Sequence, residues 1–161
     1  MPYRRLMILL IPLLLGFDAS AQPSQLQIGL GGWPGAGAQF VYVESYSVHS
    51  VEVLASFDSE LWKSRTPFYL SAGVGAALRP LGILRVIGRA DYQYDFYIGI
   101  RFGPALHFLQ RPTHAEKNRQ FSLFLDPFLR YTQPYQDLTL FFELGMQRPI
   151  TRFGVWFSLQ N

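Results

Sequence analysis

Apolar and polar residues alternate along most of the chain, most clearly in residues 96–108 (FYIGIRFGPALHF). Its even positions carry large apolar groups such as Phe96, Ile100 and Phe102, whereas its odd positions carry small, polar or cationic groups such as Arg101. Because successive side chains of a strand point to opposite faces, this pattern predicts a strand with one apolar face.

The same alternation recurs in strand-length segments that Gly, Pro and polar residues separate. These segments are residues 25–31, 39–46, 48–57, 68–78, 83–94, 121–132, 138–147 and 152–160. Short alternating segments between turn signals are typical of an all-β sandwich or barrel, and no mature segment has a sustained helical period. Bacterial single-chain membrane barrels have even strand numbers, so we expect a closed antiparallel barrel of eight strands, with ten as the alternative.

The composition of the two faces indicates which one is outside. The polar face is rich in Gly and Ala in the best segments, which suits a crowded lumen better than a solvated surface. The apolar face is almost free of charge, as contact with hydrocarbon requires. The sequence therefore predicts a transmembrane barrel, with the apolar faces toward lipid.

The charged residues of the other face are expected to pair inside the barrel, because buried charges need partners. The predicted polar lumen network comprises Arg85, Arg89, Arg101, His107, Asp126, Arg130, Glu143 and Arg152, with Glu44, Glu52 and Asp91 as further acidic partners. The lumen of an eight-stranded barrel is about filled by its own side chains, so we do not expect an open pore. Pro104 and Pro127 lack a ladder donor, and we expect each to mark a bulge or a strand end.

The N-terminal residues predict export. Arg4 and Arg5 precede an apolar run at Leu6–Phe17, and Ala19–Ala21 has the small-x-small form of a cleavage site. The run is shorter than the roughly 20 residues that a spanning helix needs. We therefore expect residues 1–21 to be a signal peptide and residues 22–161 to form one barrel domain.

Composition narrows the class of partner and chemistry. The net charge is +3, with basic residues scattered along the chain, so no nucleic-acid partner is expected. The sequence holds no cysteine and three histidines, which argues against disulfides and a transition-metal site. Aromatic residues are abundant, and several are candidates for interfacial girdles: Trp33, Trp62, Tyr42, Tyr46, Tyr92, Tyr94, Tyr131 and Tyr135.

Three segments resemble strands of the small bacterial outer-membrane β-barrel proteins: 67–79 (PFYLSAGVGAALR), 97–107 (YIGIRFGPALH) and 153–159 (FGVWFSL). The resemblance implies a location in the bacterial outer membrane. It also implies that the chain contacts outer-membrane lipid and the barrel-assembly machinery. An extracellular or periplasmic protein partner is left open.

No catalytic constellation stands out among the histidines and serines. His49 and Ser50 are adjacent, so a strand would place them on opposite faces, and no serine lies two residues from His107. We therefore expect a non-enzymatic barrel without cofactor or metal, with a structural, adhesive or interaction role through its loops. The alternatives are a lipid-modifying barrel enzyme and a soluble periplasmic or secreted barrel that binds an apolar ligand.

Overall fold

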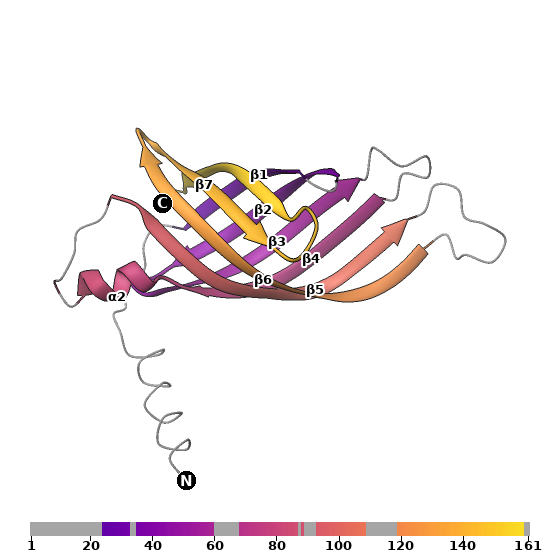
Figure 1. Ribbon diagram of the computed structural model, residues 1–161, viewed down its shortest axis with the longest axis horizontal. Coiled ribbons are helices and arrows are strands. Elements are labelled where there is room, and N and C mark those ends of the chain that lie inside the picture. Colours follow the sequence, from indigo (N-terminus) through magenta and orange to yellow (C-terminus); the bar gives the residue numbers. More distant parts are fainter. Residues whose placement is uncertain are drawn as a thin grey trace, which may run out of the picture.

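The computed structural model describes residues 24–32, 35–59, 68–86, 88, 93–108 and 119–159, which form an eight-stranded closed antiparallel barrel (Figure 1). The strands are β1 (Gln25–Gly32), β2 (Ala36–Ser45), β3 (His49–Ser59), β4 (Phe68–Leu78), β5 (Asp95–Phe108), β6 (Arg119–Tyr135), β7 (Leu138–Gly145) and β8 (Thr151–Ser158). Each strand pairs with its sequence neighbours, and β1 pairs with β8 to close the sheet. The expectation of an all-β barrel with eight strands is confirmed. The predicted signal peptide lies outside the described residues.

The prediction of a strand at residues 83–94 is wrong. The short helix α2 (Pro80–Val86) occupies the start of this segment, and residues 93–94 form a bend before β5. Pro80 stands at the first helical position, where its missing N–H and its fixed φ are both suitable. Gly88 follows with φ of 69°, and its N–H donates to the Arg85 carbonyl at 2.9 Å, which ends the helix. Among the described residues, no helix has the length and apolar character needed to span a membrane.

The alternation of side chains matches the prediction in the strands. On β5, Ile98, Ile100 and Phe102 point outward and are exposed, whereas Tyr97 and Arg101 are buried inside. The expectation that Glu44 is an acidic partner in the lumen is wrong. Glu44 lies on the outer face, between the inward-facing Val43 and Ser45. It accepts hydrogen bonds from the Tyr42 hydroxyl and, at 2.8 Å, from the Ser24 hydroxyl.

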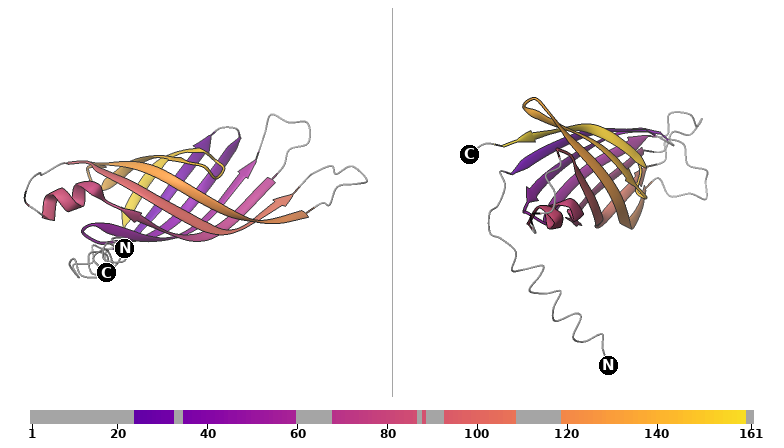
Figure 2. Two further views of the ribbon diagram at one scale, coloured as in Figure 1. Left: turned by 60° about the horizontal axis from the view of Figure 1, so that its bottom comes forward. Right: turned by 60° about the vertical axis from the view of Figure 1, so that its left-hand side comes forward.

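The two ends of the barrel differ. The end called here the helix end holds the start of β1, the β2–β3 and β6–β7 turns, α2 and the end of β8 (Figure 2). The opposite end, called the loop end, holds the connections β1–β2, β3–β4, β5–β6 and β7–β8. Gly82 allows α2 to lie close against the β2–β3 turn at the helix end, because a Cβ at this position would lie only 2.1 Å from the carbonyl oxygen of Ser47.

Neither proline ends its strand. Pro104 does interrupt the β4–β5 ladder, which lacks pairs between Ser71–Ala105 and Val74–Phe102, but the register is the same on both sides, so there is no bulge. β5 and β6 keep one continuous register from Asp95 paired with Thr132 to Phe108 paired with Arg119. Pro104 and Pro127 both point outward within this pairing. Pro127 lies just outside the ladder between β6 and β7, because the pairing of these strands begins at the next residue, Phe128. The missing N–H of Pro127 is tolerated where this ladder stops.

Candidate functional site: the barrel lumen

Six charged side chains from five strands meet in the middle of the lumen. They are Arg101 on β5, Arg130 and Asp126 on β6, Arg152 on β8, Glu52 on β3 and Glu143 on β7, all at most 2% exposed. Their inward positions follow from the alternation of each strand. The three cations and three carboxylates are equal in number, so this central network is neutral within the described part of the chain.

Glu143 is the hub of the central network. Arg101 donates to both of its carboxylate oxygens, at 2.8 and 2.7 Å, and the Arg130 Nε donates at 2.7 Å. Arg152 also donates to Glu143. Three arginines therefore converge on one carboxylate, and the bidentate geometry of Arg101 is the strongest form of such a pair.

Glu52 completes the pairing of the same arginines on the opposite side. Arg130 donates to its two oxygens at 2.6 and 3.0 Å, and Arg101 Nε donates at 2.9 Å. Because both arginines bridge both glutamates, the contacts tie β3, β5, β6 and β7 together across the lumen. The desolvation cost of these charges is offset only because nearly every polar atom has a partner.

Arg152 and Asp126 link the central network to the β7–β8 connection. Arg152 donates to Asp126 at 2.9 Å and to the carbonyls of Pro149 and Gln147 at 2.7 and 2.6 Å. Asp126 in turn accepts the backbone N–H of Met146 and Gln147, both at 2.7 Å. The lumen charges therefore hold a connection at the loop end in place.

Aromatic rings fill the space beside the arginines. The guanidinium carbons of Arg101 and Arg130 lie 3.9 and 4.8 Å from the centre of the Phe128 ring. Gly99 makes room for this ring, since a Cβ there would lie 2.3 Å from Phe128 Cζ. Phe128, Tyr97 and Trp156 belong to one buried apolar cluster, so the lumen is packed around the charges.

The structure brings together five of the eight residues predicted for the lumen network: Arg101, Asp126, Arg130, Glu143 and Arg152. Glu52, expected as a further acidic partner, joins them. Arg85 does not; it lies on α2 and pairs with Asp95 at the helix end. Arg89 and Asp91 lie outside the described residues.

His107 faces the lumen nearer the loop end. Its Nε2 lies 2.9 Å from the Ser122 hydroxyl on the adjacent strand, and its ring meets Tyr69 edge-on at 4.7 Å. The sequence search for serines along the same strand missed this pair, because Ser122 is on β6 and His107 on β5. Strand pairing, and not spacing, creates the contact.

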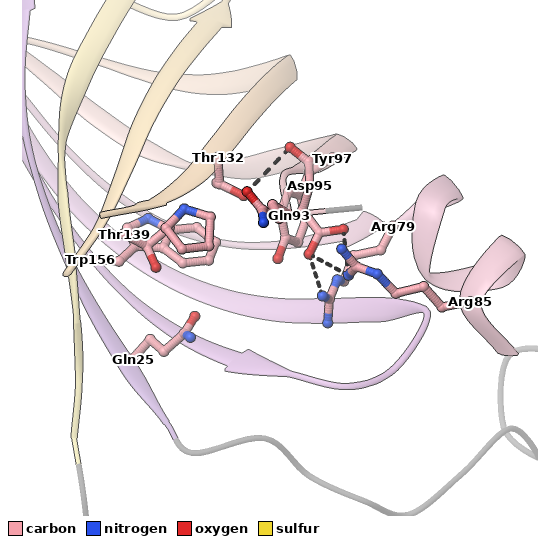
Figure 3. Close-up of a pocket in the computed structure, with 10 residues that line it drawn as sticks. Gln25, Arg79, Arg85, Gln93, Asp95, Tyr97, Thr132, Thr139 and Trp156 are labelled. Atoms are coloured by element: carbon pink, nitrogen blue, oxygen red, sulfur yellow. Dashed lines mark hydrogen bonds and ion pairs between the residues drawn. The ribbon is translucent and has the colours of Figure 1, made fainter. Parts of the chain in front are cut away.

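A second polar region, a cavity of about 280 Å³, lies at the helix end (Figure 3). Asp95 pairs there with Arg79 and, at 3.0 Å, with Arg85. Gln25, Thr139 and Trp156 line the cavity away from the arginines. Sequence reasoning did not predict this cavity, since α2 and the bend before β5 were read as a strand.

No cluster of three or more His, Cys, Asp or Glu residues with the form of a metal site occurs in the described ranges. Glu52, Asp126 and Glu143 are instead paired with arginine. A scan against protein-family models found no match for this chain, and a search of curated proteins also found none.

Proposed function

We propose that the chain is a bacterial outer-membrane β-barrel without enzymatic activity, with a closed polar lumen and a structural, adhesive or interaction role through its loops. The observation that carries the proposal is the division between the two surfaces of the sheet. Large apolar side chains are exposed on the outside of all eight strands, whereas the paired charges are inside. Exposed residues of this outer face include Leu30, Phe40, Val53, Val74, Phe102, Leu125, Phe142 and Phe153.

An apolar surface of this extent is costly in water. Monomeric soluble proteins rarely expose a contiguous apolar patch of more than a few hundred Å². In lipid the same surface is favourable, and the pairing of β1 with β8 closes the sheet. Residues 119–127 of β6 extend beyond the pairing with β7. A lipid environment therefore fits the side chains and the closed part of the sheet.

Aromatic side chains gather near both ends of the outer face. Tyr42, Tyr94, Tyr131 and Tyr135 are exposed toward the helix end. Toward the loop end, Phe68 lies between Phe57 and Phe108, with ring centres 5.9 and 6.1 Å apart. Two such groups match the interfacial girdles of membrane barrels. Trp33, Trp62 and Tyr92, also candidates for these girdles, lie outside the described residues.

The lengths of the connections support an orientation. Two of the three connections at the helix end are short turns, at residues 46–48 and 136–137, and the third, residues 79–94, contains α2. The loop end has two longer connections, at residues 60–67 and 109–118, beside shorter ones at residues 33–35 and 146–150. Outer-membrane barrels have short periplasmic turns and longer extracellular loops. We therefore assign the helix end to the periplasm and the loop end to the cell exterior.

The lumen argues against a soluble barrel that binds an apolar ligand. Such a barrel would present an apolar interior, whereas the middle of this one holds Arg101, Arg130 and Glu143 with none of their surface exposed. The same packing argues against a conducting pore and favours a role carried by the ends of the barrel.

The runner-up function is a lipid-modifying barrel enzyme, and the His107–Ser122 contact is the observation that favours it. A serine hydroxyl at 2.9 Å from an imidazole nitrogen has the geometry of a nucleophile and its base. Covalent labelling by a fluorophosphonate that disappears in Ser122→Ala, but persists in Ser56→Ala, would support the enzyme. We expect no labelling of the wild type or of either variant.

Fractionation of cells that express the full chain tests the proposed function. We expect the protein in the outer-membrane fraction, with electrophoretic migration that changes on heating because the folded barrel resists detergent. Recovery in the soluble periplasmic fraction without detergent would overturn the membrane assignment.

A further inference from the structure

β6 has an open edge near the loop end. Its pairing with β5 extends to Arg119, whereas its pairing with β7 stops at Phe128 (Figure 1). Within the described residues, positions 119–127 therefore have a neighbouring strand on one side only, over a length of about 30 Å at roughly 3.3 Å per residue. A strand edge of this kind is a template for pairing with another strand.

The course of the chain after β7 explains the open edge. Beyond Gly145 the chain does not continue beside β6 but turns toward the lumen. The Asp126 carboxylate accepts the backbone N–H groups of Met146 and Gln147 there, both at 2.7 Å. The position beside residues 119–127 that a longer β7 would take is therefore not filled by β7.

The outward side chains of this edge lack a neighbour on the β7 side. Phe121, Leu123 and Leu125 are 67%, 78% and 62% exposed. Ile100 and Phe102, outward residues of β5 with a strand on each side, are 46% and 58% exposed. A further strand beside β6 would cover the difference.

The backbone of the same residues directs its hydrogen-bonding groups to the open edge. Successive residues of a strand direct N–H and C=O to opposite edges. Pro104, outward on β5, interrupts the pairing with β4 but not the pairing with β6, so outward residues of β5 and β6 direct these groups away from their shared ladder. Phe121, Leu123 and Leu125 therefore point N–H and C=O to the β7 side, where no described backbone group pairs with them.

We propose that residues 119–127 of β6 are a docking edge for an extended segment of another protein, which pairs antiparallel to β6 and continues the ladder that β7 begins. A strand is the element that matches such a row of N–H and C=O groups. The outward side chains of the segment are apolar, because they extend the apolar outer face. Its inward side chains meet Ser122 and Phe124 beside the neutral central network, so small uncharged groups fit there.

A second copy of this chain does not fit the edge. Copies inserted in the same orientation are related by rotation about the membrane normal, so both β6 strands run from the loop end to the helix end. The same rotation places the outer face of one sheet beside the inner face of the other. Only this exclusion and the exterior position of the edge rest on the proposed function, because the edge itself belongs to the fold.

The test uses the folded wild-type protein in detergent micelles and a synthetic peptide with the sequence of residues 70–78 (LSAGVGAAL). This peptide alternates apolar residues with small uncharged ones and contains no proline. NMR measures hydrogen exchange of the Phe121, Leu123 and Leu125 amides. We expect exchange to be fast in the free protein and at least about tenfold slower at saturating peptide, because the peptide supplies the missing backbone acceptors.

Leu123→Pro tests the edge from the side of the protein. The Leu123 N–H points away from β5, so proline removes an edge donor and obstructs the docking position while the β5–β6 ladder stays intact. We expect the peptide to bind this variant at least about tenfold more weakly. Leu123→Ala keeps the N–H and is the matched control, with affinity within about threefold of the wild type.

A second peptide tests the same contact on the wild-type barrel, whether or not the proline variant folds. It carries N-methyl groups at the positions of Ala72, Val74 and Ala76, which face the edge in the proposed pairing, and it should neither bind nor slow exchange.

Three results would overturn the proposal. They are exchange that the peptide does not slow, equal affinity of the two peptides for the wild type, and edge amides that are already protected in the free protein. Protection that rises with protein concentration would assign the edge to a second copy and would also overturn it. The titration needs only a folded barrel, so its failure is distinct from failure of the membrane assignment.

Discussion

At the scale of single residues, the lumen depends on exact pairing of charge. Glu143 receives hydrogen bonds from Arg101, Arg130 and Arg152, and none of its surface is exposed. Removing one partner of a buried ion pair leaves an uncompensated charge, which costs far more than the net stabilisation of the intact pair.

Glu143→Gln tests this dependence. The variant would leave three buried arginines with two carboxylates, and we expect the free energy of unfolding to fall by about 3–5 kcal/mol. Denaturant unfolding of the protein refolded in lipid vesicles measures the change. Glu44→Gln removes an identical charge from the outer face and should change stability by less than about 0.5 kcal/mol. Equal effects of the two substitutions would refute the role of the central network.

Gly99 provides a second test at this scale. A methyl group at Gly99 would collide with the Phe128 ring at 2.3 Å and with the Ala76 carbonyl oxygen at 2.8 Å. We expect Gly99→Ala to cost about 1–3 kcal/mol through overpacking. Gly32→Ala is the matched control, because the nearest atom to its new Cβ is 3.8 Å away. Equal unfolding midpoints for the two variants would show that Phe128 moves aside without cost.

At the scale of elements, the strands could be read from the sequence and the helix could not. In β4 and β5 the alternation predicts each exposed and buried position, because the period of a strand is 2 and both faces are chemically distinct. Residues 83–94 alternate equally well, yet α2 begins at Pro80. In this segment the local helix signals, a proline at the first helical position and a glycine after the last turn, outweigh the alternation.

The lumen shows a similar division between what sequence predicts and what it does not. Inward-facing positions could be assigned strand by strand, so Arg101 and Glu143 were expected in the lumen. The side chains that meet depend on how the strands are staggered around the barrel, and no local pattern encodes that register. The cross-strand contact of His107 with Ser122 and the cavity beside Trp156 are both products of the register.

Gly82→Ala tests how α2 is held on the barrel. The added methyl group would lie 2.1 Å from the Ser47 carbonyl oxygen, so we expect the helix to separate from the β2–β3 turn. Hydrogen exchange of the α2 amides should accelerate, while the β5 and β6 amides keep their protection. Gly88→Asn is the control, since asparagine tolerates the positive φ at this position. Unchanged exchange in Gly82→Ala would contradict the docking contact.

At the scale of the whole molecule, the lumen is closed by its own side chains. Arg101, Arg130 and Glu143 span the middle of the barrel with no exposed surface. We therefore expect the purified wild-type protein to show no steady conductance in planar lipid bilayers. Steady channels of uniform size from the wild type would contradict the packed lumen.

The central claim is that the outer face of the barrel meets hydrocarbon. The chain contains no cysteine, so a single spin label can be placed by one substitution. Leu125 is 62% exposed and pairs with Phe102 in the middle part of β5 and β6, whereas Gln133 lies near the helix end. The measurement compares collisions of each label with oxygen, which enriches in lipid, and with a water-soluble nickel chelate. We expect Leu125→Cys in lipid vesicles to favour oxygen and Gln133→Cys to favour the nickel chelate. Free access of the nickel chelate to the label at Leu125→Cys would contradict a membrane-spanning barrel.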